Sequence, residues 1–361
     1  MENITSQSAA ATQAESLTPL VGDLETTLVR IAFMVAFDGA VGFLGCVANI
    51  INIIVFLKQA KPIASCNNSL SPVQGFGETV NISLMSLAVS DLGSLLTLVW
   101  ESITLNPYFI IAPLPFDSED VRYLTAAVPH AIFVRIAWWI TAFVTFERCL
   151  CIVIPLKVKQ VITARRTLVI NLTIFVVNFL CLCPIFICRS LAKKNSTSTR
   201  VETVYCTDDY FPIEKIGFTF NVVSQFSAFI IDLVCTIAII QILSMKSKWR
   251  SETASTSASG SKAGFASRDK KIIKMIGLIS GIFILCSMPS CVNYAVTVTF
   301  WEYSQDKRYI NINLMMWALI VALEAINSSV TILVYYNMSS KYKMVFKQMF
   351  SKKEQVSREK H

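Results

Sequence analysis

The sequence predicts an all-α fold, a bundle of seven membrane-spanning helices followed by a short amphipathic eighth helix. The mean hydropathy of the 361-residue chain is +0.56, and only 16% of its residues are charged, whereas a soluble chain carries about 25%. The apolar residues also gather into seven runs, each long enough to cross a bilayer, which takes roughly 17–25 residues. Backbone groups in hydrocarbon must bond internally, so these runs are predicted to be helices.

The seven runs give the elements in order and divide the chain into three parts. Polar, charged or Ser/Thr-rich stretches separate the runs and are predicted to be loops. We expect an outer tail over 1–27, a helical bundle over 28–337, and the amphipathic helix with an inner tail over 338–361. The runs cover residues 29–57, 80–107, 122–153, 167–189, 214–244, 272–300 and 311–337.

The placement of lysine and arginine predicts how the bundle is oriented. The segments after the first, third, fifth and seventh runs hold 21 of the 32 basic residues, and the opposite face holds nine. Basic residues collect on the cytoplasmic side of membrane proteins. We therefore expect a multi-pass plasma-membrane protein whose N-terminus is outside and whose C-terminus is inside. Topology and attraction to anionic lipid explain the net charge of +8, and nucleic acid is not an expected partner.

The eighth helix is predicted from the segment 340–350, which carries apolar residues at helical spacing. Such a stripe suits a helix that lies in the plane of the membrane interface. The apolar positions are Tyr342, Val345, Phe346, Met349 and Phe350.

An acidic–basic pair closes the third run. Glu147 and Arg148 are followed by the segment 154–157, which reads Ile-Pro-Leu-Lys. This arrangement resembles the signature of rhodopsin-like (class A) G-protein-coupled receptors, in which Asp/Glu-Arg-Tyr ends the third span. The resemblance implies that Glu147 holds Arg148 at rest and that Arg148 meets a heterotrimeric G protein on activation. Arrestin and a receptor kinase are further partners that the family implies.

Other motifs of the family are present in altered form over roughly residues 30–350. Residues 48–49 read Ala-Asn where Gly-Asn is usual, and 87–91 read Leu-Ala-Val-Ser-Asp. In the sixth run, 286–289 read Cys-Ser-Met-Pro, which keeps the proline of the family motif and loses its tryptophan. In the seventh run, 331–335 keep only the final tyrosine of Asn-Pro-x-x-Tyr. The resemblance therefore assigns Tyr335 to G-protein coupling.

One departure from the family concerns its disulfide. Members usually carry a cysteine 25 residues before the arginine, bonded to the second outer loop, and this position is Tyr123 here. We therefore expect no bridge from Cys206 to the third span. Cys188 is the outer alternative for Cys206.

The segment 142–159 has a narrower resemblance, to invertebrate (molluscan and annelid) orphan chemosensory-type receptors, which are distantly similar to neuropeptide receptors for FMRFamide or thyrotropin-releasing hormone. We expect a receptor for a small molecule or short peptide, chemosensory in the first instance and a neuropeptide receptor as the alternative. A transporter is disfavoured because the sequence has no internal repeat, and a seven-span odorant channel is disfavoured because its N-terminus would lie inside, against the distribution of basic residues. An enzyme is disfavoured because no nucleophile–base or metal-ligand constellation stands in the runs. A retinal photoreceptor would need a lysine in 311–337, which contains none.

Asp91 lies in the middle of the second run. Inserting a charged side chain there costs about 2.5–3.5 kcal/mol, so we expect Asp91 to have a structural or functional role. It matches the family's sodium-binding aspartate, with Asn49, Asn327 and Ser328 as expected polar neighbours. Sodium is the single candidate cofactor, and we expect no other metal. The alternative is a purely structural hydrogen-bond network around Asp91.

Three polar residues are expected to line an outer cavity that binds the ligand. His130 lies 18 residues before Arg148, which is five helical turns or about 27 Å, so both face the bundle interior. Glu101 lies ten residues beyond Asp91, and Glu324 lies two turns outside Thr331. Two carboxylates favour a cationic or hydrogen-bond-donating ligand. The alternative is that the three groups satisfy one another, with Arg135 adding charge, and leave room for an apolar ligand.

Two more charged residues lie within the runs. Arg135 points away from Arg148 around the third helix, and we expect it to pair with Asp232 in the fifth run or with a backbone carbonyl. Asp38 is either an acid at the lipid interface or a partner for Arg135, and the sequence does not decide. On the outer segments, Asn3 and Asn195 stand in Asn-x-Ser/Thr sequons and are predicted to be glycosylated.

Overall fold

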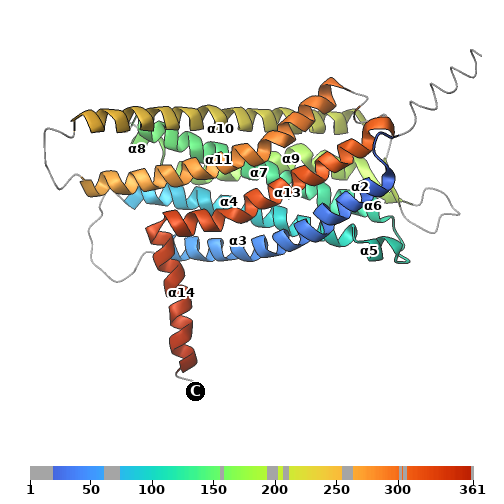
Figure 1. Cartoon of the computed structure of the whole chain (residues 1–361), viewed down its shortest axis with the longest axis horizontal. Coiled ribbons are helices and arrows are strands. Elements are labelled where there is room, and N and C mark those ends of the chain that lie inside the picture. The colour runs from blue at the N-terminus through green and yellow to red at the C-terminus, as the bar shows by residue number, and fades with distance from the viewer. Residues whose placement is uncertain are drawn as a thin grey trace, which may run out of the picture.

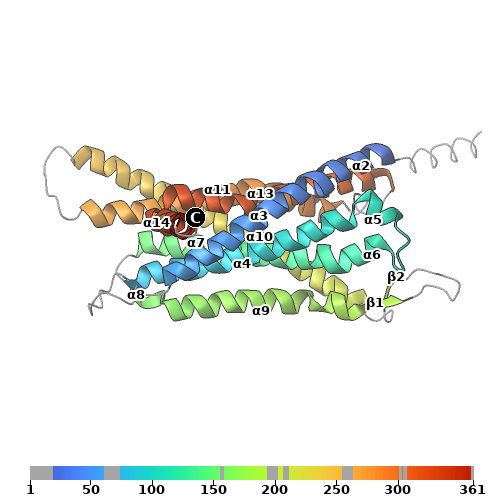
Figure 2. The same ribbon diagram turned by 90° about the horizontal axis from the view of Figure 1, so that it is seen from below.

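The computed structural model describes residues 19–60, 74–154, 158–192, 202–205, 211–253, 263–300, 303 and 307–358. Within these ranges, seven helices are long and apolar enough to cross a membrane, and they coincide with the seven predicted runs. The helices run side by side along the long axis of the molecule (Figures 1 and 2). The predicted helical bundle is confirmed.

Several spans are built from more than one helical element. The first joins α2 (Asp23–Arg30), η1 (Ile31–Phe37) and α3 (Asp38–Ala60), and the third joins α6 (Ser118–Arg122), η2 (Tyr123–Ala127) and α7 (Val128–Val153). Both η segments are π-helical turns, a wider geometry that is frequent at functional sites. Helix α2 begins at Asp23, within the segment expected to be the outer tail.

The remaining elements complete the bundle and its connections. They are α4 (Gln74–Thr104), α5 (Pro107–Ile111), α8 (Val158–Val161), α9 (Ala164–Cys188), β1 (Arg189–Ala192), β2 (Glu202–Tyr205), α10 (Phe211–Thr253), α11 (Ala263–Thr299), α13 (Lys307–Met338) and α14 (Ser340–Arg358).

The strands β1 and β2 form an antiparallel hairpin after the fourth span, with Arg189 opposite Tyr205 and Ala192 opposite Glu202. This hairpin was not predicted, because no alternating apolar pattern marks its strands. It lies at the same end of the bundle as α5 and α6 (Figure 2). We call this end the outer end, following the distribution of basic residues.

The third span is the centre of the bundle. In its most apolar window 61% of the residues are buried, compared with 22% in the fourth span. Large apolar side chains such as Leu44, Leu180 and Leu285 point outward and are 65–73% exposed. In water such exposure would be costly, so these faces are suited to lipid. Pro184 and Pro289 lie inside α9 and α11, which helices packed in a membrane bundle tolerate.

The predicted eighth helix is α14, which turns away from the end of α13 (Figure 1). Its anchor is Tyr342, which is 1% exposed and donates a hydrogen bond to Oδ1 of Asn52 across 2.6 Å. The ring also contacts Phe56 and Tyr335 at centroid distances of 5.8 Å. Burial raises the pKa of the Tyr342 phenol above its usual value, so the hydroxyl stays a donor.

Candidate functional site

His130 joins three spans in the outer half of the bundle. It lies on α7, and its side chain is buried. Its Nδ1 is 3.0 Å from the backbone oxygen of Ser94 on α4, and its Nε2 is 3.3 Å from Oε2 of Glu324 on α13. Two of the three residues expected in the outer cavity, His130 and Glu324, are therefore in contact.

Glu101, the third expected residue, pairs with a different partner. Its carboxylate accepts a hydrogen bond from Nη1 of Arg122 across 2.6 Å. Nε of Arg122 in turn donates to Glu119 across 2.8 Å, and Nη2 of Arg30 donates to the other oxygen of Glu119 across 2.9 Å. We call these four residues the ionic ladder. It connects the first span, the start of the third and the second.

Arg122 and the ionic ladder were not predicted from the sequence. The signal that could have found them is the spacing of Glu119 and Arg122, three residues apart, which puts opposite charges on one helix face. Asp117 fixes the start of that helix, because its side chain accepts hydrogen bonds from the backbone N–H groups of Glu119 and Asp120.

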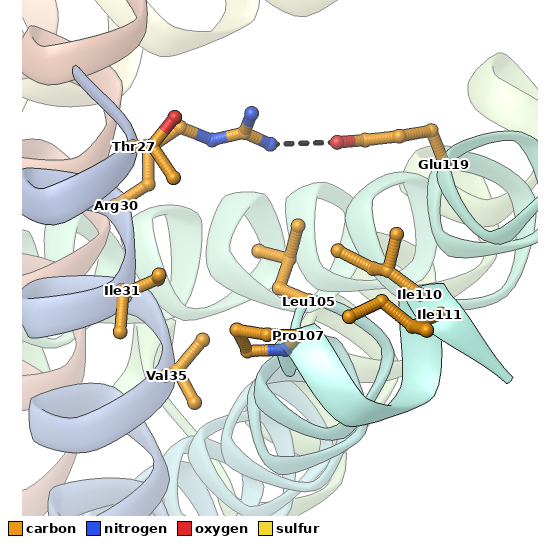
Figure 3. A pocket seen from close by; sticks show the side chains of 9 residues that line it. All are labelled: Thr27, Arg30, Ile31, Val35, Leu105, Pro107, Ile110, Ile111 and Glu119. Atoms are coloured by element: carbon orange, nitrogen blue, oxygen red, sulfur yellow. Dashed lines mark hydrogen bonds and ion pairs between the residues drawn. The ribbon is translucent and has the colours of Figure 1, made fainter. Parts of the chain in front are cut away.

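A small apolar cleft lies beneath the outermost rung of the ladder. Figure 3 shows Arg30 and Glu119 facing each other above it. Its open volume is about 190 Å³, below the roughly 300–1,000 Å³ of typical ligand pockets. Glu101, His130 and Glu324 do not line it. The lining residues are Thr27, Arg30, Ile31, Val35, Leu105, Pro107, Ile110, Ile111 and Glu119.

Asp38 is a further buried acid in the outer half of the bundle, and the sequence left its role open. It is fully buried, and neither carboxylate oxygen has a hydrogen-bond partner in the described part of the chain. It lies within electrostatic reach of His130, Glu101 and Glu324. Because a buried carboxylate without a partner is costly, Asp38 belongs with these residues as a candidate site. We call Asp38, Glu101, His130 and Glu324 the acidic cluster.

Arg135 has a different partner from the one predicted. It donates to Asn221 across 3.0 Å and to Gln225 across 2.5 Å, both on α10, and its guanidinium lies 4.9 Å from the centre of the Trp138 ring. The expected pairing with Asp232 or a backbone carbonyl was wrong. The fifth span was correctly chosen, but Asp232 lies two turns further along it, and the neutral amides are the groups within reach.

The predicted polar core around Asp91 is assembled from three spans. Asn49 donates to the backbone oxygen of Ser328 across 2.9 Å, and the Ser328 hydroxyl bonds to Asp91. Asp91 is 1% exposed, and its Oδ1 has no hydrogen-bond partner among the described residues. Hard cations are bound by oxygen ligands. Oδ1 of Asp91 and the nearby Ser328 hydroxyl are such ligands, so these residues fit sodium. Asn327 is half-buried on the same turn as Ser328.

At the inner end, Arg148 is held inside the bundle. It is 3% exposed, and its Nη2 lies 4.0 Å from Oε2 of Glu147. Glu147 also accepts a hydrogen bond from Thr167 on α9 across 3.0 Å. Tyr335 is 1% exposed, and its ring packs edge-on against Phe56 at 5.3 Å. All three residues that the resemblance assigns to G-protein coupling are therefore buried.

A second polar contact lies one turn before Arg148, toward the middle of the bundle. The hydroxyls of Thr145 on α7 and Ser280 on α11 share a hydrogen bond at 2.6 Å. It ties the third span to the sixth next to the arginine. A bundle closed in this way hides Arg148 from a partner.

Several predicted features lie outside the described residues. They are the sequons at Asn3 and Asn195 and the cysteine Cys206. Tyr123, which stands at the position of the family cysteine, is described and opens η2.

Comparison with known proteins places the chain among receptors. The family described as "7 transmembrane receptor (rhodopsin family)" matches residues 74–335. Growth hormone secretagogue receptor type 1 of Mustela putorius furo and that of Rattus norvegicus are each 27% identical over 285 residues, covering 74% of this chain and 71% of theirs. The same receptor of Homo sapiens is 26% identical over 281 residues, covering 74% and 70%. The match to the family spans most of the chain and includes Asp91, Arg148 and Tyr335. The chain is thus a multi-pass plasma-membrane receptor and not an enzyme, and it belongs to the rhodopsin family of G-protein-coupled receptors.

Proposed function

We propose that this receptor responds to an extracellular messenger of the hormone or neuropeptide type that carries a cationic group, and that it does so with its N-terminus outside the cell. The similar receptors are named for a growth hormone secretagogue, a messenger within the body. This favours the neuropeptide alternative over the chemosensory one. The resemblance to invertebrate receptors stays a prediction.

The acidic cluster carries the cationic part of the proposal. It contains three carboxylates, of Asp38, Glu101 and Glu324, and one imidazole. Arg122 neutralises Glu101 and His130 contacts Glu324, which leaves Asp38 without a hydrogen-bond partner among the described residues. Buried charge demands a counter-charge or water, and a cationic group of the ligand would supply it.

Activation is an equilibrium between a closed and an active arrangement of the bundle. A ligand shifts this equilibrium only if it binds one arrangement more tightly than the other. The closed arrangement holds Arg148 beside Glu147 and ties Thr145 to Ser280. Breaking these contacts would open the inner face and present Arg148 to the G protein. We further propose that sodium at Asp91, with Asn49, Asn327 and Ser328, stabilises the closed arrangement, and that a receptor kinase and arrestin act on the inner segments.

A functional screen tests the proposal. Cells that express the receptor are exposed to amidated peptides, amines and odorants, with cAMP and calcium as readouts. We expect a peptide or amine agonist whose potency falls about tenfold or more in Asp38→Asn, because a charge-assisted contact contributes about 1.5–3 kcal/mol. Glu25→Gln, a similar change at an exposed position outside the cluster, is the control.

Two results would contradict the proposal. An uncharged odorant as the most potent agonist would favour the chemosensory alternative. The second is an agonist that is as potent on Asp38→Asn and on Glu324→Gln as on the parent receptor, at normal surface expression. That result would show that the acidic cluster does not bind the ligand.

A further inference from the structure

Both ring nitrogens of His130 are engaged, and the partner of the first fixes its proton. Nδ1 lies 3.0 Å from the backbone oxygen of Ser94. A carbonyl oxygen has no proton to donate, so the hydrogen bond requires that Nδ1 carry one. The imidazole in this arrangement is therefore always protonated at Nδ1.

A second proton is needed on the other side of the ring. Nε2 lies 3.3 Å from Oε2 of Glu324. If Nε2 and the carboxylate were both unprotonated, two lone pairs would face each other. The contact is favourable only when one proton lies between them, either on Nε2 as an imidazolium–carboxylate pair or on Glu324 as a carboxylic acid that donates to Nε2. In both cases the pair holds one proton beyond the one on Nδ1.

Charged and titratable groups surround the pair on several helices. Asp38 on α3 and Glu101 on α4 both lie within electrostatic reach of His130, and Arg122 neutralises the second. On the side of Glu324, the electrostatic neighbours are Arg135 on α7 and, on α11, Cys286, Cys291 and Tyr294. Arg135 opposes the proton, because its two partners on α10 are neutral amides that leave its charge in place. The Glu324 carboxylate favours the proton and is the acid in direct contact with Nε2.

We propose that the His130–Glu324 pair is a proton-binding site that ties the second, third and seventh spans together, so that the pH of the extracellular side adjusts the balance between closed and active arrangements. Losing the proton replaces an attraction by a lone-pair repulsion at the junction of α4, α7 and α13. The closed arrangement is stabilised while the proton is bound and loses this contribution as the pH rises. The extracellular and signalling parts of this proposal rest on the proposed function, whereas the bound proton does not.

The chain allows a direct measurement of the proton, because it contains only two histidines, His130 and His361. In a His361→Gln variant labelled with ¹⁵N-histidine, every histidine signal comes from His130. We expect Nδ1 to stay protonated across the pH range in which the purified receptor remains folded, and the Nε2 signal to change with pH. A bare Nδ1, or an Nε2 signal that is constant over this range, would overturn the proposal.

Glu324→Gln separates the proton from the hydrogen bond. Its amide can donate to Nε2, so the junction is kept, but it has no carboxylate to share a proton with the imidazole. We expect the Nε2 titration to move to lower pH, and the melting temperature of the ligand-free receptor in detergent to fall less at high pH than that of the parent. Glu119→Gln, the same chemical change on a half-exposed acid of the ionic ladder, should leave the titration as it was.

One more result decides the matter. An identical titration in Glu324→Gln and its parent would refute the shared proton. All these measurements use ligand-free protein, so their outcome does not depend on the identity of the messenger. If the receptor activated no G protein in the functional screen, the proposed function would be refuted and the bound proton would be unaffected.

Discussion

Nη1 of Arg122 donates to the Glu101 carboxylate across 2.6 Å, and this contact joins the beginning of the third span to the outer end of the second. Glu101 is almost fully buried, and Arg122 is 18% exposed. The family usually fixes the outer end of the third span with a disulfide at the next position, which is Tyr123 here. The ionic ladder therefore connects the outer end of the third span to its neighbours in a chain that lacks the family's disulfide there.

Neutral contacts reinforce the same junction. The hydroxyl of Ser118 donates to the backbone oxygen of Thr104 across 2.8 Å, and Nε1 of Trp100 donates to the Thr125 hydroxyl across 2.8 Å. Together with Arg122 and Glu101, they hold α6 and η2 against the end of α4. The ion pair is the strongest of these contacts, because its acid is buried.

Breaking the ion pair should destabilise the receptor, and exchanging the charges should restore part of the loss. Removing one partner of a buried pair costs about 3–5 kcal/mol, because the remaining charge is left unpaired. We expect Arg122→Glu to lower the melting temperature in detergent strongly and the double variant Arg122→Glu with Glu101→Arg to recover part of it. Arg30→Gln, at the exposed rung, should cost at most about 1 kcal/mol. A double variant no more stable than Arg122→Glu would show that the pair does not hold this junction.

Replacing Arg148 by alanine should abolish G-protein activation while surface expression and ligand binding persist. Arg148 is buried beside Glu147 in the closed bundle, and the family assigns it to the G protein. Nucleotide exchange on purified G protein, driven by whichever agonist the screen yields, measures the effect.

The control for that experiment is Arg166→Ala. Arg166 is exposed after the third span and donates to the backbone oxygens of Gln160 and Val161, so its loss should leave most of the exchange intact. Undiminished exchange in Arg148→Ala would rule out the assigned role.

Tyr342→Phe should loosen the eighth helix. It removes the donor to Asn52, whose Oδ1 is buried, and a buried group that loses its hydrogen bond costs about 1–3 kcal/mol. We expect a lower melting temperature and faster amide exchange in α14. Tyr336→Phe, on the neighbouring ring that packs against Phe346 at 5.2 Å, should have a smaller effect. Equal exchange rates in α14 of the Tyr342→Phe variant and its parent would show that the hydroxyl does not anchor the helix.

The orientation of the termini is open to a simple test. The 21-to-9 division of basic residues predicts that a tag at the N-terminus is stained in intact cells and that a tag at the C-terminus is stained only after permeabilisation. The bilayer is the barrier in both cases, so each tag is the control for the other. Staining of the C-terminal tag in intact cells would reverse the topology.

The sequence alone determined the number of spans, the eighth helix and the receptor family. These depend on local properties, because a run of apolar residues becomes helical in lipid whatever its neighbours are. The stripe at Tyr342, Val345 and Phe346 likewise predicts an amphipathic helix from its own spacing. The identity of Arg148 could be predicted because its motif is contiguous in the chain.

Only the tertiary structure decided which polar groups meet. Glu101 was predicted as a wall of the outer cavity, and the structure pairs it with Arg122, a residue of a short helix that begins the third span. Arg135 bonds Gln225 rather than Asp232, and Asp38 joins the acidic cluster. Helical spacing gives the face on which a side chain lies, but its partner depends on how each helix is rotated and bent. The π-helical turns at η1 and η2 change that rotation at the outer end, where these residues lie.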